Sequence, residues 1–114
     1  MQSTGRFVTE DLVVGETTVP AGAWVTTLIA SANRDETVFA YPDHFDPGRA
    51  NADDHLAFSG GIHYCLGAPL ARLEGEVALA GLATRFPGLE LTGNGEPRAI
   101  TVIRGFARLP VVSR

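Results

Sequence analysis

Short runs of apolar and β-branched residues alternate with turn residues along the first part of the chain. Two runs, Leu12–Val14 and Thr17–Val19, are separated by Gly and Glu, which predicts a β-hairpin. After a Pro-Ala-Gly turn, Ala23–Ile29 is rich in Val, Thr and Trp and predicts a third strand that meets the first two. The segment Ala30–Asp35 loses this pattern and favours a helical turn.

Hydrophobic periodicity disappears between Tyr41 and Gly61. Pro, Gly, Asp and Asn are so frequent in this segment that neither a long strand nor a helix is expected. The sequence therefore predicts an ordered coil of about twenty residues, a length that is uncommon in a compact domain unless the coil is functional or its structural context is missing.

The clearest periodic segment predicts a helix from about Ala68 to Arg85. Pro69 is tolerated in the first turn, and a Pro-Gly pair after Phe86 ends the helix. Its apolar positions follow helical spacing and predict one buried face, formed by Leu66, Leu70, Leu73, Val77 and Ala80 or Gly81. Short strands are predicted beyond it at Leu89–Leu91, Ala99–Ile103 and Leu109–Val112. The fold class is therefore α+β.

Composition and charge narrow the possible functions. The chain has 114 residues, and its 9 basic residues, all Arg, against 13 acidic ones give a net charge of −4. No basic stripe for nucleic acid is present, so we expect no nucleic-acid partner. No apolar stretch approaches the roughly 20 residues that a bilayer requires, and no signal peptide is recognised, so we expect a cytoplasmic protein without a membrane contact. No internal repeat or composition shift indicates a second domain.

The single cysteine, Cys65, lies where a glycine-rich loop reaches the predicted helix. Unpaired backbone N–H groups and the positive end of the helix dipole favour a thiolate at such a position. The thiolate could be a nucleophile, a redox sensor or a metal ligand, and the alternative is a small buried apolar residue. Three glycines near the thiol, Gly60, Gly61 and Gly67, would leave room for a flat, bulky group against the backbone.

The loop and the following helix resemble the haem-binding signature of the cytochrome P450 haem-thiolate monooxygenases. The matching positions are Phe58, Gly61, His63, Cys65, Gly67, Leu70, Ala71 and Arg72. Four further segments are similar to bacterial members in the same order: VPAG, ANRD, PDHFDPGR and RGFARLPV. The resemblance covers essentially the whole chain but only the C-terminal minority of a complete member. It implies a single partial domain, 1–114, that forms the C-terminal part of the P450 fold.

The resemblance implies haem b as the cofactor and Cys65 as the thiolate ligand of its iron. His63 occupies the position of a basic side chain that contacts one haem propionate, and Arg6 is similar to the second propionate anchor. Without the motif, His63 would be interpreted as a loop histidine in solvent and Arg6 as an exposed strand charge.

Three other loop residues receive roles from the resemblance. Phe58 resembles the aromatic residue that shields the sulfur, Gly61 the residue that lets the loop turn under the ring, and Gly67 the residue that lets the helix approach the haem. Without the motif, each glycine would be an ordinary turn residue and Phe58 a minor core residue.

The remaining roles that the resemblance implies are contacts with a redox partner, contacts with the substrate and a structural ion pair. Arg72 is the candidate contact for a ferredoxin-type redox partner, and Val102 and Ile103 are the candidate walls for a small organic substrate. Arg49 resembles the arginine that completes an ion-pair cluster with an ExxR helix, and neither that helix nor the distal oxygen-activating helix is in this sequence. We therefore expect a truncated or split monooxygenase that is inactive alone. The helices that would cover the apolar face of the predicted long helix are missing too, so we expect that face to remain exposed.

Alternatives use the same residues differently. A non-enzymatic haem-binding or sensing module would need the same thiolate loop. A cysteine hydrolase could pair Cys65 with His63, but no orienting Asn or oxyanion-hole pattern accompanies them. A zinc site is disfavoured because His44, His55, His63 and Cys65 lack paired ligand spacing.

Overall fold

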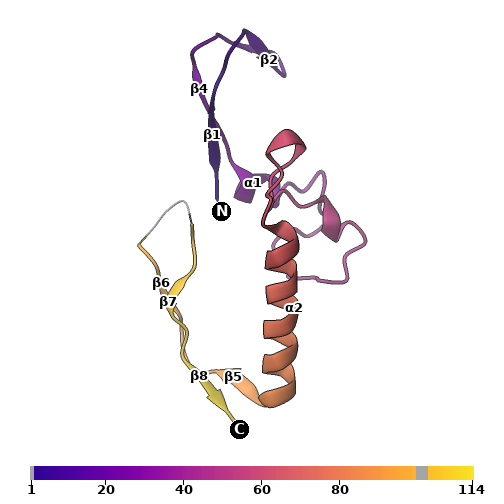
Figure 1. Ribbon diagram of the computed structural model, residues 1–114, viewed down its shortest axis with the longest axis vertical. Coiled ribbons are helices and arrows are strands. Elements are labelled where there is room, and N and C mark those ends of the chain that lie inside the picture. The colour runs from indigo at the N-terminus through magenta and orange to yellow at the C-terminus, as the bar shows by residue number, and fades with distance from the viewer. Residues whose placement is uncertain (1, 100–102) are drawn as a thin grey trace. The chain divides into compact units, whose positions relative to one another are not determined.

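The computed structural model describes residues 2–99 and 103–114, and these residues form two compact units. The first unit ends at Ala57 and the second begins at Phe58. Figure 1 shows the one long helix in the second unit and short strands in both. The mixed α+β class is confirmed, while the assignment of 1–114 to one partial domain stays a prediction.

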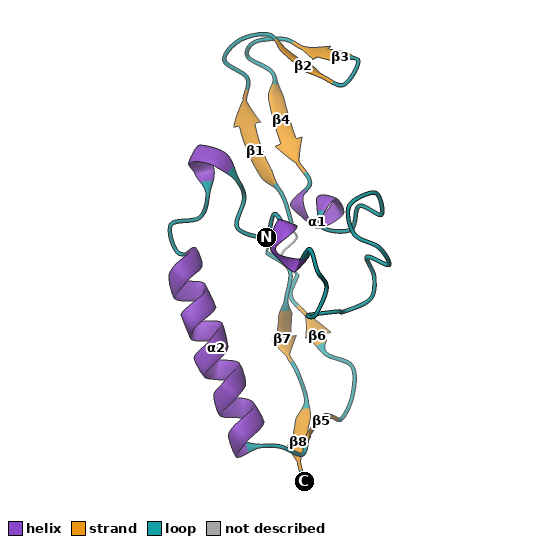
Figure 2. Cartoon of the chain, turned by 90° about the vertical axis from the view of Figure 1, so that its right-hand side faces the viewer, coloured by secondary structure: helices purple, strands orange, loops and turns teal. Residues whose placement is uncertain are grey.

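Two antiparallel ribbons open the first unit (Figure 2). Strand β2 (Leu12–Val14) pairs with β3 (Thr17–Val19), which confirms the predicted hairpin. The predicted third strand is shorter, β4 (Trp24–Thr27), and it pairs with β1 (Thr4–Phe7) rather than with the hairpin. That part of the prediction is wrong. The Trp24 indole lies over Gly5, where a Cβ would overlap the ring, so glycine is required at this position of β1.

A short helix and a coil complete the first unit. Helix α1 (Ile29–Ala32) confirms the predicted helical turn. The coil that follows contains one 3-10 turn, η1 (Ala52–Asp54), and otherwise no regular element up to Ala57. Ile29 and Phe39 are the buried apolar residues described in this unit, so its small core lies between α1 and the start of the coil.

The second unit begins with the cysteine loop, which contains the 3-10 turn η2 (Gly61–His63), and continues into α2 (Ala68–Arg85). Both ends of the predicted helix are confirmed, because Pro69 fits its first turn and Pro87 cannot continue it. The apolar face of this helix is exposed, as expected for a chain without the helices that would cover it. Leu70, Leu73 and Val77 are all exposed. No helix within residues 2–99 and 103–114 meets the length and hydropathy that a membrane span requires.

Short antiparallel pairs end the chain. Strand β5 (Leu89–Leu91) pairs with β8 (Val111–Ser113), and β6 (Glu96–Pro97) pairs with β7 (Phe106–Arg108). The first predicted strand is confirmed, and the last begins two residues later than predicted. The predicted strand Ala99–Ile103 includes residues outside the described ones, and the two described residues at its ends lie in bends. Sequence reasoning missed β6 and β7, which have only two and three residues and so show no alternating pattern.

Candidate functional site

Backbone hydrogen bonds define the path of the cysteine loop. The Cys65 N–H donates to the Phe58 carbonyl at 2.9 Å, which closes the loop on itself. The Tyr64 N–H donates to the Gly61 carbonyl at 3.1 Å, and Gly61 has a φ of +58°, a left-handed conformation that favours glycine. The Ala68 N–H donates to the Cys65 carbonyl at 3.1 Å. The cysteine is therefore held between a closed loop and the first residue of α2.

The thiol of Cys65 is free and exposed, and apolar side chains lie beside it in sequence. Ile62 is 96% exposed and Leu66 is 99% exposed. A Cβ built on Gly67 would lie 3.8 Å from the Cys65 Sγ, so this glycine leaves the space beside the sulfur unfilled. A free thiol flanked by open space and exposed apolar side chains fits a flat, apolar, metal-containing group such as haem.

An aromatic and cationic cluster supports the loop. The Phe58 and Tyr64 ring centroids are 6.3 Å apart. The guanidinium carbon of Arg72, from α2, lies 5.1 Å from the Phe58 ring centroid. The structure thus brings Phe58, Cys65 and Arg72 together within the second unit, as three of the predicted site residues.

The other predicted site residues are placed as follows. His63 ends η2 and is exposed. Arg6 lies in β1 of the first unit, where its guanidinium donates to the neighbouring Gly5 carbonyl at 2.8 Å. Ile103 is exposed, and Val102 lies outside the described residues. The propionate and substrate-wall roles of these residues stay predictions.

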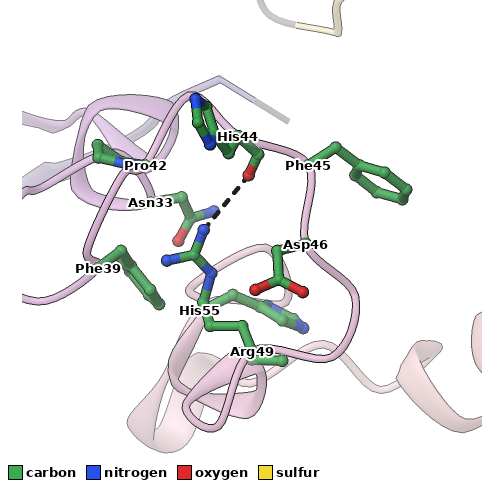
Figure 3. A pocket seen from close by; sticks show the side chains of 9 residues that line it. Asn33, Phe39, Pro42, His44, Phe45, Asp46, Arg49 and His55 are labelled. Carbon is green, nitrogen blue, oxygen red and sulfur yellow. Dashed lines mark hydrogen bonds between the residues drawn. The ribbon is translucent and has the colours of Figure 1, made fainter.

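Arg49 organises the coil of the first unit, beside a cavity of about 200 Å³. Its guanidinium donates to the carbonyls of Ala40, Tyr41 and His44, the last two at 3.3 Å. Its charge lies 5.9 Å from the centre of the Phe39 ring. Figure 3 shows this guanidinium among the side chains that line the cavity. The arginine expected to lack its partners is therefore engaged by carbonyl groups of its own coil.

Two asparagines, which sequence reasoning missed, also fix this coil. The Asn51 side chain donates to the Val38 carbonyl at 2.9 Å, and the Leu56 N–H donates to Asn33 Oδ1 at 2.7 Å. Each bond joins residues more than ten positions apart, so the side-chain amides replace the missing strand or helix ladder. An Asn in a segment without regular structure is a signal for such bonds, but it does not identify the partners.

A carboxylate near the start of the coil accepts two local hydrogen bonds. Asp35 accepts hydrogen bonds from the Thr37 hydroxyl at 2.6 Å and from the Thr37 N–H at 2.9 Å. These bonds, the hydroxyl first, hold the pKa of Asp35 below its usual range. The two hydrogen bonds to ionised Asp35 therefore stabilise the folded chain when the pH is above the ordinary carboxyl pKa. This stabilisation is lost as the pH falls through the lowered pKa of Asp35.

Known proteins are similar to this chain along nearly its whole length. A family model described as Cytochrome P450 matches residues 1–108. The chain is 49% identical over 109 residues to nocardicin C N-oxygenase of Nocardia uniformis, covering 93% of this chain and 27% of that protein. It is 41% identical over 113 residues to 6-deoxyerythronolide B hydroxylase of Saccharopolyspora erythraea, covering 96% of this chain and 28% of that protein.

A solved structure has the same fold over the same region. P450BioI, in complex with an acyl carrier protein ligated to hexadec-9Z-enoic acid, aligns with a TM-score of 0.93 and 38% identity. The alignment covers 99% of this chain and 29% of that one. The chain spans about a quarter of the length of the curated relatives that it matches.

Proposed function

Because this chain belongs to the cytochrome P450 family, we propose that it supplies the cysteine ligand of a haem-thiolate monooxygenase that oxidises a small organic substrate. The observation that carries the proposal is the exposed, free thiol of Cys65 within a closed loop at the start of α2. Relatives named as an N-oxygenase and a hydroxylase support an oxidation as the reaction class.

Each loop residue has a defined task in this proposal. Cys65 would bind the iron of haem b, and its thiolate would donate electron density to the metal. The group, when bound, supplies dioxygen chemistry that no side chain of this chain can provide. Phe58 would lie beside the sulfur and limit water, while Gly61 and Gly67 keep side chains away from the ring. His63 and Arg6 would donate charge-assisted hydrogen bonds to the two propionates.

We also propose a cellular location and the residues that contact the substrate. One free cysteine fits a reducing compartment, so we place the protein in the cytoplasm. Val102 and Ile103 are proposed to contact part of a small organic substrate.

Haem titration tests the proposal. We expect the purified chain to take up one equivalent of haem b, with a Soret shift on binding. Haem dimethyl ester, which lacks propionate charges, should bind roughly three- to tenfold more weakly, because the charge-assisted contacts are lost. His63→Leu should remove part of that difference, and His63→Arg should restore it.

Two results would contradict this assignment. A chain that takes up no haem would refute the proposed function. Equal affinity for haem and its dimethyl ester, unaffected by His63→Leu, would refute the propionate roles of His63 and Arg6. It would not affect the assignment of Cys65 as the iron ligand.

A redox partner is the second testable part of the proposal. We propose that the positive charge of Arg72, on the exposed start of α2, contributes to steering an acidic ferredoxin. Arg72→Glu should weaken association of the haem-loaded protein roughly three- to tenfold at low salt, and the difference should shrink as ionic strength rises. Arg85→Glu, at the other end of the same helix, is the matched control. Equal effects of the two reversals would reduce Arg72 to a general contributor to net charge.

A further inference from the structure

The side chain of Arg72 extends from α2 over the start of the cysteine loop. Its guanidinium carbon is 5.1 Å from the centre of the half-buried Phe58 ring, within the range of a cation–π interaction. Long side chains on a helix point toward its N-terminus, which is the direction of the loop. The contact therefore joins residues fourteen positions apart, on either side of Cys65.

The available carboxylate does not compete for this guanidinium. Glu76 lies four residues further along α2, at ion-pair spacing, yet the ion pairs of residues 2–99 and 103–114 do not include Arg72. An arginine placed before a glutamate is the weaker order for such a pair. The side chain of Arg72 thus turns to the aromatic ring instead of along the helix.

The Phe58 ring is coupled to the cysteine through the backbone. The Phe58 carbonyl accepts the Cys65 N–H at 2.9 Å, and the Cys65 carbonyl accepts the Ala68 N–H at 3.1 Å. Together with the contact between Arg72 and the Phe58 ring, these two backbone bonds connect the loop to the first turns of α2 at three points. These three contacts therefore oppose a rotation of α2 relative to the loop.

We propose that Arg72 is a positioning residue for Cys65, which acts by holding the Phe58 ring against the first turns of α2. The inference rests on the proposed function, since it concerns the direction in which the thiolate meets the haem iron. Arg72 would thus have two roles, as a contact for the redox partner and as a support for the cysteine loop. The two tasks are separable, because the experiment below contains no ferredoxin.

The test uses the full chain loaded with haem, reduced and exposed to carbon monoxide. The long-wavelength Soret band reports the thiolate-ligated fraction, and its half-life in moderate urea reports how firmly the thiolate is held. We expect Arg72→Gln to shorten that half-life roughly two- to fivefold, the range of one exposed cation–π contact. Arg72→Lys, which keeps a cation near the ring, should recover most of the loss. Arg85→Gln on the same helix should behave like the parent chain.

A double-mutant cycle identifies the ring as the partner. Phe58→Leu should shorten the half-life on its own, and Arg72→Gln should add little to it, because the contact is already gone. Equal effects of Arg72→Gln in the presence and absence of Phe58 would overturn the positioning role. So would an Arg72→Lys variant no better than Arg72→Gln.

The outcomes also separate this inference from the proposed function. A parent chain with no long-wavelength band refutes the proposed function, and the positioning role is refuted with it. A parent chain with the band and an unchanged half-life in Arg72→Gln refutes the positioning role alone.

Discussion

Without haem, the 114-residue chain is expected to show no cooperative thermal transition and to bind a hydrophobic dye strongly. Its described core comprises only Ile29, Phe39 and Ala68, the last of them small. Exposed apolar side chains include Leu70, Leu73 and Val77 along α2. Burial on this scale offsets little of the roughly 1–2 kcal/mol of conformational entropy lost per ordered residue. Amides between Tyr41 and Gly61 should exchange rapidly, because their hydrogen bonds are exposed to solvent.

Calorimetry and dye binding check this expectation, and Ile29→Ala is the matched variant. In a cooperatively folded domain, removing a buried isoleucine side chain costs roughly 2–5 kcal/mol and lowers the Tm by many degrees. In the haem-free chain we expect no transition that could shift. A sharp melt of soluble monomer that Ile29→Ala lowers, together with protected coil amides, would contradict the expectation.

The helix was predictable because local signals determine it. Pro69 marks the first turn of α2, and the Pro-Gly pair after Phe86 marks its end, so both boundaries follow from backbone chemistry. The hairpin was predictable for the same reason, since a two-residue turn fixes the register of Leu12–Val14 against Thr17–Val19. These elements depend on neighbours in sequence.

Pairing over longer distances was not predictable. Strand β4 pairs with β1 because Trp24 packs over Gly5 and against Phe7, and β-propensity alone does not select that partner. The exposure of the α2 face did not follow from helical spacing, which shows which side chains can be covered and not whether anything covers them. It was predicted from the absence of the covering helices that the family resemblance implies. The side-chain hydrogen bonds of Asn33 and Asn51 in the coil likewise depend on the three-dimensional path of the chain.

The candidate site was predicted through its motif and not through its geometry. The spacing from Phe58 to Arg72 identified the loop residues, and the structure adds the bond from Cys65 to the Phe58 carbonyl. The stacking of Arg72 on Phe58 could not be derived from spacing, because it requires the loop to close on the helix. The sequence predicted that Arg49 lacks its ion-pair partners. It did not show that the Arg49 guanidinium binds carbonyl groups of its own coil, because that contact depends on how the coil folds back.

Substitution of Cys65 is expected to abolish thiolate ligation completely. It is the one cysteine in the sequence, so no other residue can donate a thiolate to the iron. Cys65→Ser and Cys65→Ala should lose the long-wavelength Soret band of the ferrous carbonyl form. Cys65→His should bind iron through an imidazole and give a band at shorter wavelength. Arg85→Gln, a surface change on α2, should leave the spectrum unaltered.

The most direct test of the haem-thiolate assignment is the ferrous carbonyl spectrum of the parent chain beside that of Cys65→Ala, recorded at equal haem content. The account predicts the long-wavelength Soret band in the parent chain and its absence in the variant. The same band in Cys65→Ala, or its absence from a haem-loaded parent chain, would contradict the account.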